Sequence, residues 1–321
     1  MSPLRQDRDS NGGLPVHRSN SLRPRLFRSL PLLWLLSAAA LLPSCASAPA
    51  PRAAPADTAA APRWLEVNDI SLRYQLIGAG PHTLVLLHEM QMSMESWDEL
   101  LPALTPGHRI LRYDLRGFGL SEKVRGSTLS IDDEVQDLRA LLDALDIREP
   151  VTLIGGAVGG AIALKFAATY PQRVLAVAVT SPAAYMQAQP ERAASAAALE
   201  HQSLRSGFDQ TLDAVYPASL RTPARLARFR GLVLANDPGS LAATTHMIYS
   251  VGFADVLPKV QCAALVVATA LFPRPVASFK ELADAMPKGR FVVLQTGHFA
   301  SLESPELVAP VLQQFLTDVG G

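Results

Sequence analysis

A glycine-rich stretch that follows an apolar segment is the place where this sequence could present a reactive side chain. Residues 153–160 read Leu-Ile-Gly-Gly-Ala-Val-Gly-Gly. Glycines at this spacing permit a sharp, strained strand-to-helix turn that projects one side chain above a sheet. The projected residue is Ala157, and its methyl group has neither a lone pair nor an acidic proton. Covalent acyl transfer from this turn is therefore excluded.

His298 is the second candidate, because it follows the last apolar strand of the chain. Imidazole is well suited to moving protons near neutral pH. Two interpretations stay open. His298 is a general base, polarised by Glu89, that activates water or removes a substrate proton, or it is a histidine that only forms hydrogen bonds in a pocket. His88 follows a buried strand and is expected to be a structural hydrogen-bonding residue.

The elements that would position these residues alternate between strands and helices. Continuous apolar runs are typical of strands buried on both faces. Alternating apolar residues predict an opening hairpin at residues 65–76. The apolar runs predict strands at residues 83–88, 109–114, 151–156, 174–179, 263–268 and 290–295. Helical spacing of apolar residues predicts helices at 97–104, 130–145, 158–170, 278–286 and 305–316. This alternation requires right-handed crossovers, which favours an α/β fold with an open, doubly wound, mostly parallel sheet.

The alternation of strands and helices is interrupted between about residues 184 and 250. That segment is rich in Ala, Arg and Leu and shows no strand pattern. We therefore expect a helical cap inserted into one domain that spans residues 63–321. Its arginines are expected to form mainly a solvated face.

Four motifs in order along residues 64–320 resemble the α/β-hydrolase superfamily. They are the 153–160 turn, Leu86-Leu87-His88, the run Arg-Tyr-Asp-Leu-Arg-Gly-Phe-Gly at 112–119, and Gly297-His298-Phe299. The likeness is greatest to the branch of small ester and lactone hydrolases of the 3-oxoadipate enol-lactonase type. The resemblance implies a nucleophile at residue 157, a catalytic base at His298 and a pocket for a small ester, lactone or carbonyl compound.

The sequence departs from that pattern at three positions. Ala157 replaces the nucleophile, and Phe272 stands where the acid that orients the histidine should follow the seventh strand. The resemblance places the oxyanion donors near Met90 and Val158. There Glu89 replaces the usual glycine, and a carboxylate about 4 Å from a developing oxyanion would cost roughly 4 kcal/mol at an effective dielectric constant near 20.

Apolar side chains near these positions could line an adaptable pocket. Core filling is an equally good interpretation of them. Asp114 is predicted to organise its turn by accepting N–H groups from residues 116–119. The candidates for the pocket lining are Met92, Phe118, Phe272 and Phe299.

Composition narrows the function classes. The sequence has 29 Lys plus Arg and 29 Asp plus Glu, so no strong overall field attracts nucleic acid. Two cysteines, Cys45 and Cys262, are too few for a zinc site or a disulfide framework. We expect no metal and no cofactor, and the oligomeric state is left open.

Residues 1–45 are predicted to form an export segment, because arginines precede an apolar run at 30–42 that is too short to span a bilayer comfortably. The run ends in Leu-Pro-Ser-Cys, which resembles a bacterial lipobox with Cys45 as the lipidated residue. Cleavage near Ala48 is the alternative. Residues 46–62 form an Ala/Pro-rich linker. Either route predicts a periplasmic or lipid-anchored domain at a bacterial envelope.

Three functions remain open from the sequence. The first is a protein with a small-molecule pocket that binds its ligand or performs proton transfer without an acyl-enzyme. The second is a weak ester or lactone hydrolase in which His298 and Glu89 activate water. The third is a catalytically dead binding protein tethered at the envelope.

Overall fold

The computed structural model describes residues 61–125, 129–206 and 208–320. Their centre is an eight-stranded sheet in the order β1-β2-β4-β3-β5-β6-β7-β8. β1 and β2 form an antiparallel hairpin, β2 also pairs antiparallel with β4, and all later neighbours are parallel. The strands are β1 (Arg63–Val67), β2 (Ile70–Ile77), β3 (His82–Leu87), β4 (His108–Tyr113), β5 (Val151–Gly156), β6 (Val174–Thr180), β7 (Ala263–Thr269) and β8 (Gly289–Leu294).

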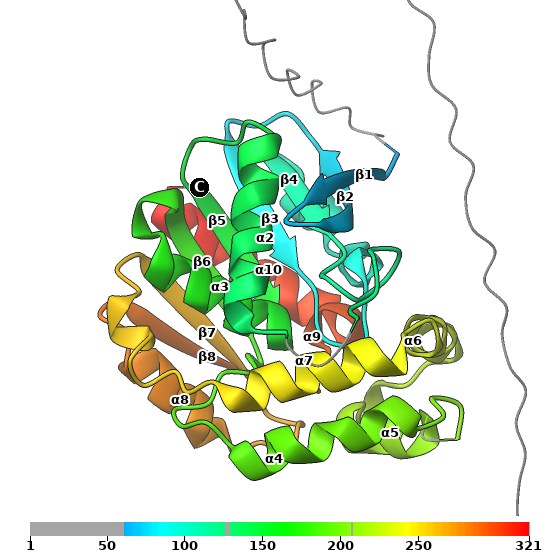
Figure 1. Ribbon diagram of the computed structural model, residues 1–321. Helices are drawn as coiled ribbons and strands as arrows, with labels where there is room; N and C mark the ends of the chain where they lie inside the picture. The colour runs from blue at the N-terminus through cyan, green and yellow to red at the C-terminus, as the bar shows by residue number, and fades with distance from the viewer. Residues whose placement is uncertain (1–60, 126–128, 207, 321) are drawn as a thin grey trace, which may run out of the picture. The chain divides into compact units, whose positions relative to one another are not determined.

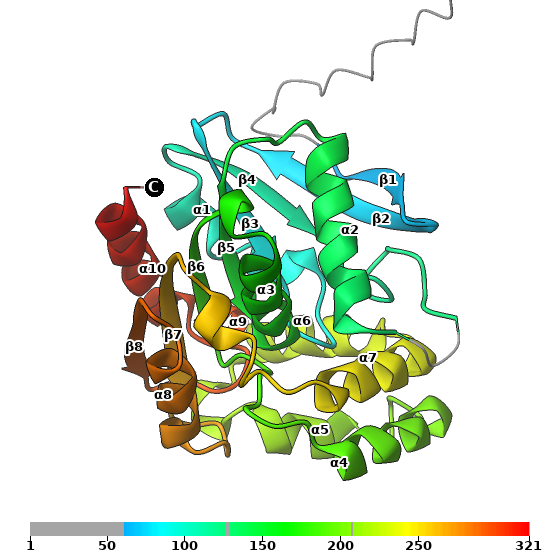
Figure 2. The ribbon, with the colours of Figure 1, turned by 60° about the vertical axis from the view of Figure 1, so that its left-hand side comes forward.

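The predicted α/β architecture is confirmed, with the sheet lying between two helical layers (Figures 1 and 2). One layer consists of α2 (Ile131–Ala144), α3 (Ala157–Thr169) and α8 (Val276–Asp284). The apolar side chains of these helices belong to the hydrophobic core on one face of the sheet. The other layer contains α1 (Leu101–Leu104) and α10 (Pro305–Val319). All six residues of β5 are buried because both faces of that central strand are covered.

Local signals placed some helices well and others poorly. Ser130 and Asp133 form the predicted capping box at the start of α2. The helix predicted at residues 97–104 is wrong, because the chain instead forms a 3₁₀ turn, η1 (Met94–Trp97), and then the short α1. A further short helix, α9 (Ala300–Glu303), follows His298 and was not predicted.

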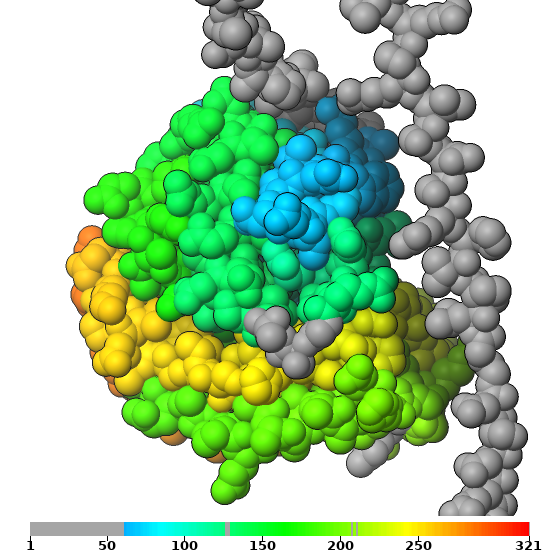
Figure 3. Space-filling view, in the orientation of Figure 1, coloured from blue at the N-terminus to red at the C-terminus, as the bar shows by residue number. Residues whose placement is uncertain are grey.

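The segment between β6 and β7 contains helices and no strand among its described residues. It crosses the carboxyl ends of the strands, and α7 lies beside the α4–α5 segment in the ribbon and space-filling views (Figures 2 and 3). Its α-helices are α4 (Pro190–Ser195), α5 (Phe208–Val215), α6 (Pro223–Leu234) and α7 (Pro238–Ser250). We call this segment the cap.

The predicted export segment 1–45, with Cys45, lies outside the described residues, as does nearly all of the 46–62 linker. Within the described ranges, no helix combines the length and apolar character needed to cross a membrane. The same ranges contain no cluster of His, Cys, Asp or Glu suited to holding a metal ion.

Candidate functional site

The turn from β5 to α3 has the sharp geometry that its glycines predict. Ala157 is the first residue of α3 and has φ +43°, in the left-handed region that costs a non-glycine residue energy. A Cβ at Gly155 would overlap the Gly159 carbonyl, and one at Gly159 would overlap the Leu87 carbonyl. The chain therefore keeps a strained turn whose apex presents a methyl group.

The start of α3 leaves backbone donors without partners. The first N–H groups of a helix have no acceptor within it, and the N-cap residue Gly156 has no side chain to supply one. Neither the Val158 N–H nor the Met90 N–H has an acceptor among the described residues. These two donors are the ones that the resemblance assigned to an oxyanion, and the positive end of the α3 dipole adds to them.

His298 lies in the loop between β8 and α9 and is held by neutral groups. The Ser181 hydroxyl is hydrogen-bonded to its Nδ1 at 3.0 Å. Phe272 stacks on the imidazole with ring centroids 4.2 Å apart, and Phe299 packs edge-on at 5.0 Å. Burial, helped by the charge of Arg274, lowers the pKa of His298 to about 4. The imidazole is therefore neutral at physiological pH.

Ser181 was missed as a site residue, because a serine at the end of a buried strand carries no signal of its own in the sequence. Ser181 has φ +42°, so a second strained turn directs its hydroxyl toward the histidine. The Ala183 N–H also donates to the Ala157 carbonyl at 2.8 Å, which fixes this loop against the apex of the β5–α3 turn.

The predicted pair of Glu89 and His298 is not formed. The buried Glu89 carboxyl instead accepts hydrogen bonds from Ser301 Oγ at 2.8 Å and Ser96 Oγ at 3.3 Å. It also fills the space beside Gly156, where any Cβ would overlap it. Burial raises the pKa of Glu89, which favours its uncharged form. The carboxyl thus packs behind the turn, and its position gives no support to the repulsion expected from the sequence.

A second buried carboxyl, Glu303, was also missed. Its Oε1 accepts the Phe299 N–H at 3.1 Å, next to His298, while its Oε2 has no partner among the described residues. Burial raises the pKa of Glu303 to about 8, and ionisation of the nearby Glu89 would act in the same direction. The only signal in the sequence was an acidic residue in an apolar segment after the histidine. That pattern does not distinguish a buried carboxyl from an exposed one.

The predicted pocket residues are divided among different surroundings. Met92 and Phe299 are buried in a cluster closed by the cap side chains Phe208, Tyr216 and Phe229, so they fill a core. Phe118 also belongs to the core, where it packs edge-to-face on His88 at 5.6 Å. Among the four candidates, only Phe272 borders a described cavity.

His88 and Asp114 have structural roles. His88 Nδ1 lies 2.7 Å from the Glu89 carbonyl, and Nε2 accepts the Leu115 N–H at 2.9 Å, which fixes a neutral ring with the proton on Nδ1. Asp114 accepts the N–H groups of Met94 and Leu120, both at 2.8 Å, and not those of residues 116–119 as predicted. Both side chains therefore organise the loops around the site.

Comparisons with known proteins agree with this arrangement. The family model described as alpha/beta hydrolase fold matches residues 82–238. A protein of Pseudomonas savastanoi pv. phaseolicola named "Putative carbamate hydrolase RutD" is 30% identical over 247 residues, which cover 73% of this chain and 93% of that protein. A shorter match, 31% identical over 138 residues, covers 43% of this chain and only 36% of the dihydrolipoyllysine-residue acetyltransferase component of the acetoin cleaving system of Cupriavidus necator.

A solved structure, the enol-lactonase from Burkholderia xenovorans LB400, superposes with a TM-score of 0.73 at 27% identity and covers 79% of this chain and 100% of that one. The predicted family rested on four sequence motifs, which lie at the β5–α3 turn, at the end of β3, after β4 and in the histidine loop. The chain belongs to the α/β-hydrolase fold superfamily, in the branch of the enol-lactonases and small esterases.

Proposed function

We propose that this protein binds a small ester, lactone or other carbonyl compound at the β5–α3 turn without forming an acyl-enzyme. The observation that carries this proposal is Ala157 at the apex of the turn. The backbone keeps the strained shape that presents a side chain in this fold, while the side chain itself has no nucleophilic atom. The relatives named as a carbamate hydrolase and an enol-lactonase motivate the choice of carbonyl ligands.

The α3 N-terminus supports the binding half of the proposal. The N–H groups of Val158 and Met90, which have no acceptor among the described residues, are suited to donate hydrogen bonds to a carbonyl oxygen, whose partial negative charge is also favoured by the helix dipole. The neutral His298 supplies a further polar group, and it is bonded to Ser181 in the loop that contacts the Ala157 carbonyl. These groups suit a dipolar ligand.

The same geometry argues against turnover through water. A base with a pKa of about 4 removes protons poorly at neutral pH, because its conjugate acid is not stabilised. Nδ1 of His298 is bonded to Ser181, and Glu89 is bonded to Ser301 and Ser96. The alternative of a weak hydrolase that uses His298 with Glu89 therefore lacks the hydrogen bond that it needs.

A labelling and binding experiment tests the proposal. The protein is treated with a fluorophosphonate probe and examined by intact mass, and binding of δ-valerolactone is followed by ligand-observed NMR. We expect no adduct, no lactone hydrolysis above the buffer rate, and binding that is lost in Ala157→Leu because the larger side chain fills the turn. A probe adduct on this chain, or hydrolysis proportional to protein concentration, would contradict the proposal.

The N-terminal segment gives the location in which we propose that this binding takes place. Export by residues 1–45 and anchoring through Cys45 would hold the domain at an envelope membrane. Metabolic labelling with a fatty-acid analogue in a bacterial host should mark the full chain and not its Cys45→Ala variant. Labelling that is equal in both would exclude the anchor.

A further inference from the structure

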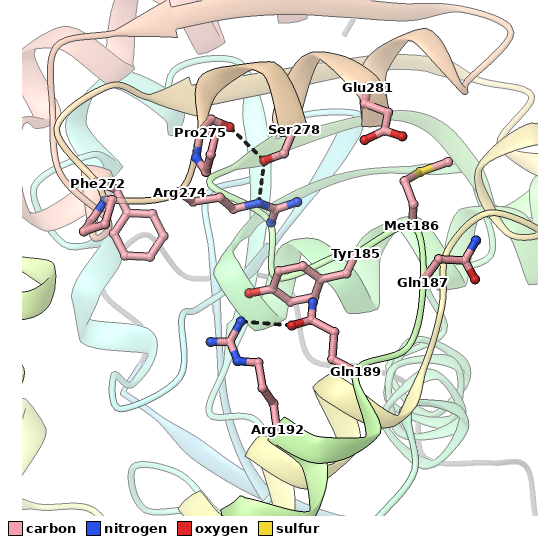
Figure 4. A pocket seen from close by; sticks show the side chains of 11 residues that line it. Tyr185, Met186, Gln187, Gln189, Arg192, Phe272, Arg274, Pro275, Ser278 and Glu281 are labelled. Atoms are coloured by element: carbon pink, nitrogen blue, oxygen red, sulfur yellow. Dashed lines mark hydrogen bonds between the residues drawn. The ribbon is translucent and has the colours of Figure 1, made fainter.

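A cavity of about 550 Å³ lies between the segment after β6 and the beginning of α8 (Figure 4). Its wall combines apolar, aromatic and charged side chains. The lining residues that could contact a ligand through charge or apolar surface include Tyr185, Met186, Arg192, Phe272, Arg274 and Glu281. Three of these are charged, and with two arginines against one glutamate the lining carries a net charge of +1.

Arg274 is an arginine with an unusual set of partners. It donates to the carbonyls of Pro182 and Ala184 at 2.7 Å each and to Ser278 Oγ at 2.8 Å, all of them neutral groups. Every other arginine that is at least partly buried in the described ranges forms an ion pair with Asp or Glu. Three of its five N–H groups are used, so two remain to bind an anion.

A second guanidinium, that of Arg192, lies on the same aromatic ring. Figure 4 shows Tyr185 between the two arginines, with ring-to-guanidinium distances of 4.5 Å for Arg274 and 5.8 Å for Arg192. Arg192 also stacks on Tyr249 at 4.0 Å and has no ion-pair partner among the described residues. Burial lowers the pKa of Arg274, and the positive charge of Arg192, on the same tyrosine ring, acts in the same direction.

We propose that this cavity binds an organic monocarboxylate with a small apolar body. One negative charge would compensate the net charge of the lining and relieve the repulsion between Arg192 and Arg274. Guanidinium groups match the planar geometry of a carboxylate. Phe272 and Met186 provide apolar wall for the rest of the ligand.

The carboxylate cavity and the β5–α3 turn use different polar groups. They adjoin at Phe272, whose ring stacks on His298 and also borders the cavity. The arginines and Glu281 belong to the cavity, whereas the free N–H groups belong to the turn. The inference therefore goes beyond the proposed function and can fail separately from it.

Isothermal titration calorimetry on the full chain with phenylacetate tests this inference, with phenylacetamide as the neutral probe of the same shape. We expect phenylacetate to bind at least about tenfold more tightly than phenylacetamide, the factor that a charge-assisted hydrogen bond typically supplies. Arg192→Gln should weaken phenylacetate binding by about tenfold, and Arg192→Lys should retain most of it because the charge remains. Glu281→Gln should tighten binding, because it removes the opposing charge.

Arg205→Gln is the matched control, since Arg205 is an exposed arginine outside the cavity lining that forms no ion pair with a described residue. It should leave the affinity unchanged. Arg274 is not the first choice for substitution, because it also fixes the loop after β6. Equal binding of the two probes, or unchanged binding in Arg192→Gln, would overturn the inference. Binding of inorganic phosphate as tight as that of phenylacetate would overturn the assignment to a carboxylate.

Discussion

Glu303→Gln should change how the stability of this protein depends on pH. Glu303 is fully buried, and its pKa is raised from 4.5 in the unfolded reference to about 8 in the folded chain. Between these two values the folded state holds a proton that the unfolded state has released. The free energy of unfolding therefore falls as pH rises through this window, and below pH 4.5 this contribution is fully retained.

The size of the effect follows from the shift. Each pH unit inside the window costs about 1.4 kcal/mol, so a rise from about pH 5 to about pH 8 should remove roughly 4 kcal/mol of stability. Glutamine keeps an oxygen to accept the Phe299 N–H but does not titrate. The Glu303→Gln variant should consequently lose much less stability over this range than the wild-type protein.

Urea unfolding at a series of pH values measures this difference. Glu134, another buried carboxyl with a raised pKa, contributes the same background to both proteins. Glu89 interacts electrostatically with Glu303, so the difference between the two curves reports the titration of Glu303 together with its coupling to Glu89. The exposed Glu66 offers a control, and Glu66→Gln should follow the wild-type curve. If wild type and Glu303→Gln lose stability in parallel between pH 5 and pH 8, the assignment of a buried neutral carboxyl beside the histidine loop is refuted.

Three further predictions concern the turn and the histidine. Ala157→Gly should raise the melting temperature, because it relieves a left-handed backbone costing about 1 kcal/mol or more, and a lower melting temperature would contradict the strain. Gly156→Ala should destabilise the fold through overlap with Glu89, and Glu89→Ala should offset much of that loss in a double-mutant cycle; additive effects would show that the two do not touch. In ¹⁵N NMR titrations His298 should stay neutral down to about pH 5, since its pKa is about 4. The unfolded chain binds a proton at this histidine below about pH 6.5 and the folded chain does not, so the free energy of unfolding should fall as pH drops below 6.5. A titration midpoint above pH 6 would contradict the burial of the imidazole.

The sequence predicted the parts of this molecule that depend on local patterns. Buried strands produce continuous apolar runs. The glycine spacing around Ala157 indicates a sharp strand-to-helix turn, because the backbone of that turn needs small residues whatever packs around it. Helix position was less predictable where the signal was short. The segment at residues 97–104 contains Pro102 and forms only one helical turn, Leu101–Leu104, after a 3₁₀ turn at Met94–Trp97.

The contacts of the site were harder to predict than its location. Ser181 and His298 are 117 residues apart, and their hydrogen bond depends on two loops meeting at the carboxyl edge of the sheet. Glu89 was recognised as a departure from the family, but sequence does not give the direction of a side chain. Its carboxyl packs behind the β5–α3 turn because it is hydrogen-bonded to Ser96 and Ser301, which belong to two separate elements.

The electrostatic character of the site connects these observations. Acyl-transfer sites stabilise charge that develops on an oxyanion and an imidazolium. Here the apex is a methyl group, the position of the acid is a phenyl ring, and the histidine is bonded to a hydroxyl and kept neutral by burial. Such surroundings stabilise neither charge separation nor an imidazolium, yet they leave the first N–H groups of α3 available to donate to a carbonyl oxygen. A hydroxyl placed at residue 157 alone would therefore leave the base without a charged partner, which is why we expect the Ala157→Ser variant to show no ester hydrolysis.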